Sequence, residues 1–175
     1  MSEISGVALF GKLNSLAFKT IDGATTLCKL RGNPYVELEH WLMQMANTPD
    51  CDLHRIVRRF DIDPSKLAAD LTSALDRLPR GASSISSLAE PIADAIERAW
   101  VYASLKFGAT KVRTGHLLFG MLKTPRLASR LLATSRQFER IQADVLGAEF
   151  AKIVAGGAED ALAAEAATPG GAGTA

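Results

Sequence analysis

The sequence predicts an all-α protein of about eight helices. Apolar residues recur three or four positions apart from Ser15 to Leu30 and from Leu38 to Ala46, which is the spacing of one buried helix face. Asp63-Pro64 and Thr124-Pro125 have the form of helix starts, because the first residue can cap free N–H groups and proline is tolerated at the first helical position. No stretch alternates convincingly in the β-branched pattern of a strand.

The two halves of the chain resemble one another. Residues 24–29 (ATTLCK) align with residues 99–104 (AWVYAS). With one residue added in the following loop, residues 36–45 (VELEHWLMQM) align with residues 112–121 (VRTGHLLFGM). A repeat of about 75 residues is too long for a solenoid unit, so we expect two four-helix units packed with pseudo-two-fold symmetry.

Two changes in composition divide the chain. Residues 79–88, PRGASSISSL, separate a first repeat at about 15–78 from a second at about 89–155. We expect these repeats and a short extra N-terminal helix to make up one domain of residues 1–155. Residues 156–175 hold eight alanines and five glycines. They bury too little apolar surface to offset the entropy of ordering them, which predicts a flexible linker.

Charge and cysteine content exclude several classes of protein. Lys plus Arg is 20 and Asp plus Glu is 19, whereas a nucleic-acid or membrane-surface binder relies on concentrated positive charge. Two cysteines are too few for a disulfide framework and indicate a reducing compartment. The chain has no apolar run of the ~20 residues that a bilayer requires and no signal-peptide pattern. We therefore expect a cytoplasmic protein that binds neither nucleic acid nor membrane.

The motifs of enzyme and metal chemistry are incomplete. Residues 6–13, GVALFGKL, match a phosphate-binding loop except that Leu13 replaces the hydroxyl residue that would meet magnesium. His40 and His116 occupy equivalent repeat positions, which favours a repeated structural hydrogen bond. Cys51 and His54 lack the further pair that a tetrahedral zinc site needs. We expect no catalytic, cofactor or metal site in this chain.

An apolar cluster lies ahead of and in the first helix of the first repeat, without a counterpart immediately before the second repeat: Val7, Ala8, Leu9, Phe10, Leu13, Leu16 and Phe18. It could simply pack into the core. Alternatively, an extra short helix beside residues 15–30 would leave an apolar trough that accepts an amphipathic helix through anchors at i, i+3, i+4 and i+7. The candidate lining residues, including two from the segment between the repeats, are Leu9, Phe10, Leu13, Leu16, Phe18, Ile85 and Leu88.

The repeated pattern Ala-x-x-Leu-Ala/Cys, a Gly-containing loop, Val and then Glu/Gly-His-Trp/Leu-Leu resembles the double repeat of the Clp-type N-terminal domain, which precedes the ATPase modules of AAA+ unfoldases. The resemblance covers roughly residues 9–155. Residues 9–14 (LFGKLN), 38–42 (LEHWL) and 96–100 (IERAW) are similar to the branch associated with type VI secretion, ClpV or TssH. The ATPase modules of that family, with their ATP and magnesium, are not in this sequence, which indicates a fragment or excised domain.

The resemblance implies a partner. In the secretion branch, from Gram-negative bacteria, the N-domain recognises an N-terminal helix of the large sheath subunit (TssC/VipB-like), so that the contracted sheath can be disassembled and recycled. The alternative is the N-domain of a general quality-control unfoldase, which would bind adaptors or degradation tags. The family also implies a monomeric isolated domain and a hexameric parent.

Overall fold

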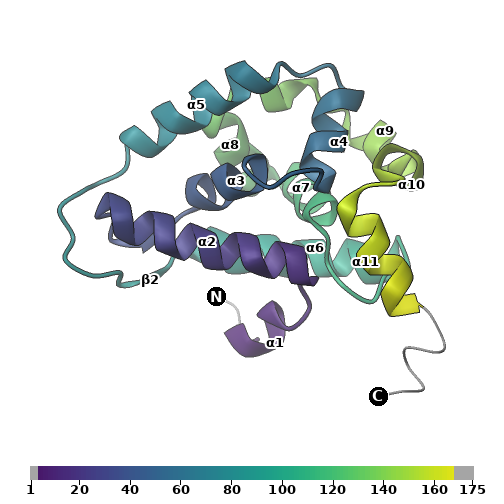
Figure 1. Ribbon diagram of the computed structural model, residues 1–175, viewed down its shortest axis with the longest axis horizontal. Coiled ribbons are helices and arrows are strands. Elements are labelled where there is room, and N and C mark those ends of the chain that lie inside the picture. The colour runs from purple at the N-terminus through teal and green to yellow at the C-terminus, as the bar shows by residue number, and fades with distance from the viewer. Residues whose placement is uncertain (1–3, 168–175) are drawn as a thin grey trace.

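Eleven α-helices and one 3-10 helix make up residues 4–167, which are the residues that the computed structural model describes (Figure 1). The predicted all-α class is confirmed. Two strands of two residues each, β1 (Tyr35–Val36) and β2 (Ser87–Leu88), are paired in parallel. The helices are α1 (Gly6–Phe10), α2 (Ser15–Arg31), α3 (Leu38–Ala46), α4 (Asp52–Arg59), α5 (Pro64–Asp76), α6 (Glu90–Leu105), α7 (Thr114–Leu122), α8 (Pro125–Thr134), η1 (Arg136–Arg140), α9 (Ala143–Ala148), α10 (Phe150–Val154) and α11 (Ala158–Ala167). None of them is long and apolar enough to cross a bilayer.

Side-chain caps set the start of several helices. Asp63 Oδ1 accepts a hydrogen bond from Ser65 N at 2.8 Å, as expected for a cap before α5. Asn14 caps α2 in the same way, with Oδ1 accepting from Ala17 N at 2.7 Å. Thr124 precedes α8 but does not cap it, because its hydroxyl donates to the carbonyl of Gly120 at 2.8 Å instead.

The two repeats exchange short backbone pairings. Val36 pairs with Leu88, and Leu13 forms an isolated parallel bridge with Val112. In the repeat alignment, Leu88 corresponds to Leu13 and Val112 corresponds to Val36. Leu13 and Leu88 lie just before α2 and α6, the first long helices of the two repeats, and Val36 and Val112 lie just before α3 and α7, the helices that follow. Each pairing thus joins equivalent positions of opposite repeats, as pseudo-two-fold symmetry requires. Within the repeats, α2 packs on α3 and α6 packs on α7.

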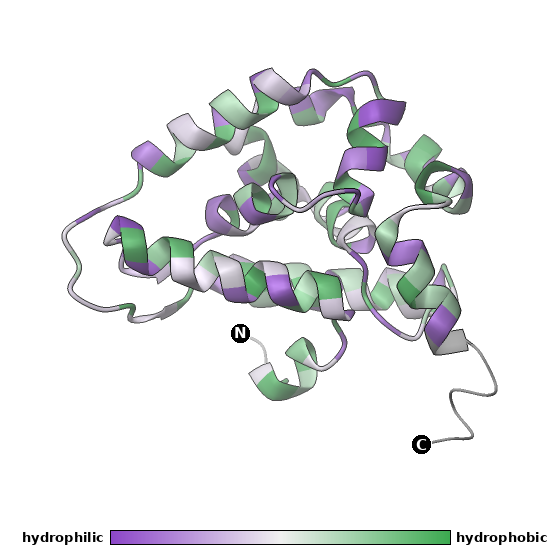
Figure 2. Ribbon diagram, viewed as in Figure 1, coloured by the Kyte–Doolittle hydropathy of each residue, from purple (hydrophilic) through white to green (hydrophobic). Residues whose placement is uncertain are grey.

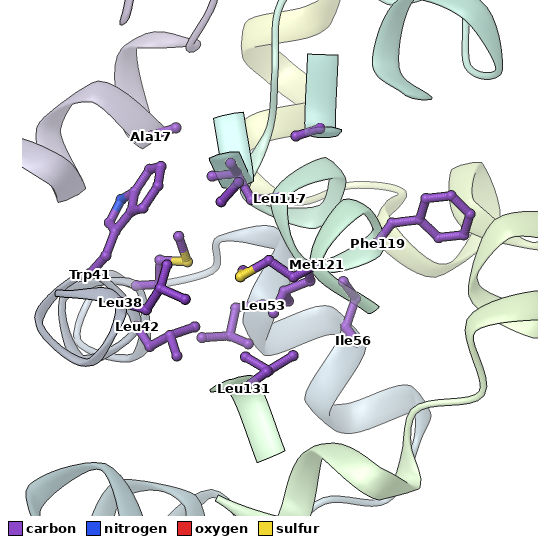
Figure 3. Packing of buried hydrophobic residues seen from close by; sticks show 14 of the residues in the cluster. Ala17, Leu38, Trp41, Leu42, Leu53, Ile56, Leu117, Phe119, Met121 and Leu131 are labelled. Atoms are coloured by element: carbon purple, nitrogen blue, oxygen red, sulfur yellow. The ribbon is translucent and has the colours of Figure 1, made fainter. Parts of the chain in front are cut away.

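A single apolar core joins the repeats. Trp41 of α3 is fully buried, and its indole Nε1 donates to the Thr20 hydroxyl at 2.8 Å. Figure 3 shows side chains of α3 and α4 meeting Leu117 and Met121 of α7 in one cluster. Along most helices, apolar and polar residues alternate in the manner of one buried face (Figure 2).

His40 and His116 fix the equivalent helices α3 and α7 at their first turns. His40 Nδ1 accepts from Glu37 N at 2.9 Å, and His116 Nδ1 accepts from Arg113 N at 3.1 Å. The predicted repeated structural hydrogen bond is confirmed. Burial and a nearby arginine lower the pKa of His40 to about 4 and the pKa of His116 to about 3.

This burial makes stability depend on pH. The folded-state pKa of His116 lies below the unfolded value, so the unfolded chain takes up the proton first and stability is lost as the pH falls below about 6.5. His116→Asn keeps an acceptor near the position of Nδ1 but does not titrate. We expect the stability advantage of the wild type over this variant to shrink by about 2 kcal/mol between pH 7.5 and 5, measured by chemical denaturation. An unchanged difference would mean that His116 is not held neutral.

The expectation of a flexible linker from residue 156 is wrong for residues 158–167, which form α11. Gly156 has φ 80°, a left-handed conformation that glycine adopts without strain, and it turns the chain from α10 towards α11. Glu159 at the start of α11 is completely buried and hydrogen bonded. The hydrogen bonds of Glu159 thus attach α11 to the domain, although the segment has little apolar surface to bury. Residues 168–175 lie outside the described residues.

Candidate peptide-binding groove

The short helix α1 has two apolar sides. Its start is capped by Ser5, whose Oγ accepts from Ala8 N at 3.2 Å. Leu9 is buried where α1 packs against α6. Val7, by contrast, is 86% exposed, and Phe10 is half-buried. One side of α1 is thus attached to the domain, and the other lines an open surface.

That surface is a groove bounded by α1, the first turn of α2 and α11. It has a volume of about 830 Å³. Phe18 of α2 contributes a large apolar side chain that is 49% exposed. Lys19 and Lys111 lie among the lining residues, and Lys111 Nζ donates to the carbonyl of Gly11 at 2.6 Å. The apolar lining residues are Val7, Phe10, Leu13, Phe18 and Leu162.

Three of the seven residues proposed from the sequence line this groove: Phe10, Leu13 and Phe18. The other four do not. Leu9 lies on the opposite side of α1, and Leu16 is half-buried against the core. Ile85 and Leu88 also pack against the core, because the chain between the repeats is tied to β1.

Val7 and Leu162 also line the groove, although neither is among the lining residues predicted from the sequence. Val7 belongs to the apolar cluster that the sequence displays, and its large exposure identifies it as part of a surface. Leu162 was missed because it lies in the segment that composition assigned to a linker. Leu162 is the one large apolar residue of α11, and this was the feature of the sequence that could have indicated a contact there.

A second hollow lies on the other side of α1, between α1 and α6. Leu9, Trp100 and Val101 line it together with several charged side chains. Two of these charges contact neighbours within the hollow: Lys12 Nζ lies 4.4 Å from the centre of the Trp100 ring, and Arg126 pairs with Asp94 at 3.1 Å. The hollow is therefore more polar than the groove beside Phe18, and the groove is the better candidate for an apolar ligand.

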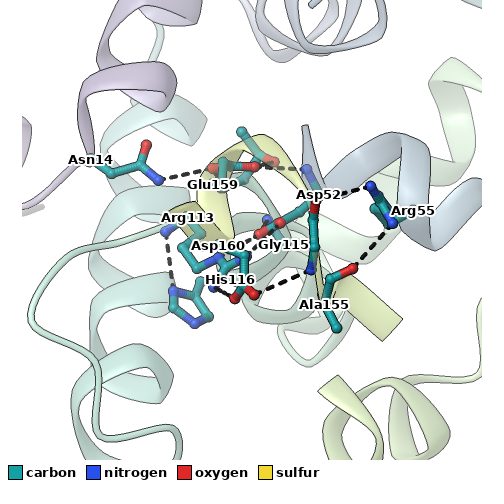
Figure 4. A network of polar contacts seen from close by, with 11 residues as sticks. Asn14, Asp52, Arg55, Arg113, Gly115, His116, Ala155, Glu159 and Asp160 are labelled. Atoms are coloured by element: carbon teal, nitrogen blue, oxygen red, sulfur yellow. Dashed lines mark hydrogen bonds and ion pairs between the residues drawn. The ribbon is translucent and has the colours of Figure 1, made fainter. Parts of the chain in front are cut away.

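Behind the groove lies a buried polar network (Figure 4). Arg113 Nε and Nη2 donate to the two carboxylate oxygens of Asp52, each at 2.9 Å. Glu159 accepts from the Asn14 side chain at 3.0 Å and from Thr114 N at 2.7 Å. Burial and the neighbouring Glu159 raise the pKa of Asp52 to about 7, against the opposing effect of Arg113. The network joins both repeats, α11 and the junction between α1 and α2.

The near-match to a phosphate-binding loop is a helix in the structure. Gly6–Phe10 form α1, and no described strand precedes them to present such a loop. The arrangement of the described residues is that of a binding surface: an open apolar groove with a rigid polar support.

Comparison with known proteins assigns this fold to a family. The family model of the Clp repeat (R) N-terminal domain matches residues 12–135. The chain belongs to the Clp repeat N-terminal domain family. The match covers the first repeat and most of the second, and it includes Leu13 and Phe18 of the groove. It ends before α9, so α11 lies outside the matched residues.

Individual relatives agree with this assignment. The AAA+ ATPase ClpV1 of Pseudomonas aeruginosa is 56% identical over 164 residues, which are 94% of this chain and 18% of that protein. The chain therefore spans less than a fifth of that relative's length. A solved structure described in connection with the coevolution of the ATPase ClpV, the TssB-TssC sheath and the accessory HsiE protein has a TM-score of 0.88 at 56% identity and covers 91% of this chain and 98% of its own.

A third relative carries a ligand. The complex of a ClpV N-domain with a VipB peptide superposes with a TM-score of 0.78 and covers 91% of this chain and 97% of its own. Its sequence identity to this chain is 22%, so the likeness extends to the fold alone.

Proposed function

We propose that this chain is the substrate-recognition domain of a type VI secretion AAA+ ATPase. In this proposal its groove binds an amphipathic N-terminal helix of the large sheath subunit. The observation that carries the proposal is the exposure of Val7 and Phe18 on one apolar groove beside α1. Large apolar side chains that gather on an open surface are typical of an interaction site. The 56% identity to ClpV1 and the peptide-bound ClpV N-domain support this choice of partner.

The groove suits a helix because its apolar residues come from three segments. Val7 and Phe10 come from α1, Phe18 comes from α2, and Leu162 comes from α11. A bound helix would place residues at i, i+3, i+4 and i+7 against these side chains. Binding would hold the sheath subunit near the ATPase modules of the full-length protein, which would supply ATP hydrolysis and the hexameric ring.

The test is a pair of substitutions at opposite ends of α2. Phe18→Ser removes an exposed apolar anchor from the groove, whereas Leu30→Ser removes a leucine that is 80% exposed and outside the groove lining. We expect Phe18→Ser to weaken binding of a synthetic peptide from the N-terminus of the large sheath subunit by about 10- to 100-fold, because burying one such side chain contributes roughly 1.5–3 kcal/mol. Isothermal titration calorimetry measures the affinity.

Both variants should melt at nearly the wild-type temperature, because both side chains are exposed. Equal loss of affinity in the two variants would contradict the position of the site. A wild-type chain that ignores the sheath peptide but binds a degradation tag or an adaptor would favour the quality-control alternative.

A further inference from the structure

One side chain anchors α11. Glu159 is completely buried, and both of its carboxylate oxygens are used. Oε1 accepts from Asn14 Nδ2 at 3.0 Å and from Thr114 N at 2.7 Å. Oε2 accepts from Asp52 N at 2.7 Å and from the Thr114 hydroxyl at 2.5 Å. These donors belong to three separate segments, so docking of α11 satisfies donors throughout the network.

The rest of α11 buries little apolar surface. After the first turn, Ala161, Ala163 and Ala164 are exposed, and Leu162 is half-buried. Asp160 adds an ion pair with Arg113 at 3.1 Å and is itself 44% exposed. Because the apolar contact is small, the polar contacts of Glu159 and Asp160 in the first turn are important for the position of α11. Such contacts lose most of their value once water can replace them.

The anchor and the groove share a residue. Asn14 lines the groove, caps α2 through Oδ1, and donates through Nδ2 to Glu159. Leu162, one turn further along α11, lines the groove directly. If α11 left its site, the groove would lose one apolar wall, and the amide of Asn14 would lose its acceptor.

We infer that α11 is a detachable wall of the peptide groove and that Glu159 is the positioning residue that latches it. This inference rests on the proposed function, and it adds that the bound helix and the docked α11 stabilise each other. Coupling of this kind is reciprocal: a ligand that binds the docked form more tightly favours docking by the same factor.

Three variants of the whole chain separate the wall from the latch. Leu162→Ala trims the wall without touching the network. Glu159→Gln places an amide NH2 group among donors that need an acceptor. Glu139→Gln in η1 is the control, because Glu139 is exposed, pairs only with its neighbour Arg136 among the ion pairs of the described residues, and does not line the groove. The probe is the same synthetic sheath peptide, and amide hydrogen exchange followed by mass spectrometry reports the docking of α11.

We expect the peptide to slow exchange in α11 of the wild type by about tenfold. A tenfold change corresponds to about 1.4 kcal/mol of coupling between peptide binding and docking of α11. Leu162→Ala and Glu159→Gln should each weaken peptide binding by about tenfold, and Glu159→Gln should also speed exchange in α11 of the free protein. Glu139→Gln should match the wild type in both measurements.

Two outcomes overturn different claims. A wild-type chain that does not bind the sheath peptide overturns the proposed function and the coupling with it. The second outcome is that the wild type binds the peptide and Phe18→Ser loses binding, while Leu162→Ala and Glu159→Gln bind normally and the peptide does not slow exchange in α11. That outcome overturns only the role of α11. Should Glu159→Gln unfold, Leu162→Ala still decides whether α11 is a wall of the groove.

Discussion

Replacing Arg113 with alanine should lower the free energy of unfolding by about 3–5 kcal/mol, because it leaves the Asp52 carboxylate buried without a cation. Asp52 is completely buried, and Arg113 is 8% exposed. The two side chains meet in a bidentate ion pair with both distances at 2.9 Å. Chemical denaturation of the wild type and Arg113→Ala measures the loss.

The pH dependence of this loss identifies its cause. Burial and Glu159 already raise the pKa of Asp52 to about 7, and without Arg113 it should rise further. A carboxyl group whose folded-state pKa is raised costs stability as the pH increases, so Arg113→Ala should be less damaging at pH 5 than at pH 8.

Two control variants complete the test of this ion pair. Arg80→Ala breaks an exposed pair with Asp76 and should cost less than about 1 kcal/mol. Asp52→Asn combined with Arg113→Met removes both charges and should recover part of the loss. A loss for Arg113→Ala as small as that of Arg80→Ala would show that the buried pair does not support the fold.

Gly120→Ala should cost about 3 kcal/mol, at the upper end of what an overpacked core usually loses. A Cβ added to Gly120 would lie 2.9 Å from Ala99 N and 3.1 Å from Ala99 Cα. These are backbone atoms of α6, so α6 and α7 would have to move apart. Differential scanning calorimetry or urea denaturation measures the effect.

The first repeat offers the matched control, Gly23→Ala. In the second repeat the glycine of the interface between the two helices is Gly120 of α7. In the first repeat the equivalent interface, between α2 and α3, has its glycine on the other helix, at Gly23 of α2, which corresponds to Arg98. A Cβ at Gly23 would meet the end of the Gln44 side chain, which can rotate away. Alanine also favours a helix interior over glycine by roughly 0.5–1 kcal/mol, so Gly23→Ala should be close to neutral. Equal losses in the two variants would mean that the close backbone approach at Gly120 is not the cause.

Local patterns predicted the helices and the relation between the repeats. The spacing of apolar residues in α2 and α3 is visible within a few turns of chain, and the equivalence of His40 and His116 follows from alignment alone. Their structural hydrogen bonds could be expected because each histidine binds a backbone N–H three residues before it. Contacts over such short separations depend on the sequence nearby.

The attachment of α11 could not be predicted in that way. Glu159 satisfies donors at residues 14, 52 and 114, which lie far from it in sequence. Its segment is rich in alanine and glycine, and that composition correctly indicates a small apolar contact but carries no sign of a buried carboxylate. For the same reason the groove was predicted only in part: the wall from α1 and α2 is local, whereas Leu162 reaches it through the long-range network.

The exchanged pairings of Leu13 with Val112 and of Leu88 with Val36 have a consequence for how the domain is assembled. Each half of the chain supplies two residues to these pairings, and the ion pair between Asp52 and Arg113 crosses the same boundary. Neither half is then a self-sufficient folding unit, although each contains a full set of helices. The internal duplication behaves like a dimer whose two subunits have been fused into one chain. We expect the two halves to fold together, so that a destabilising substitution in either half lowers the stability of the whole domain.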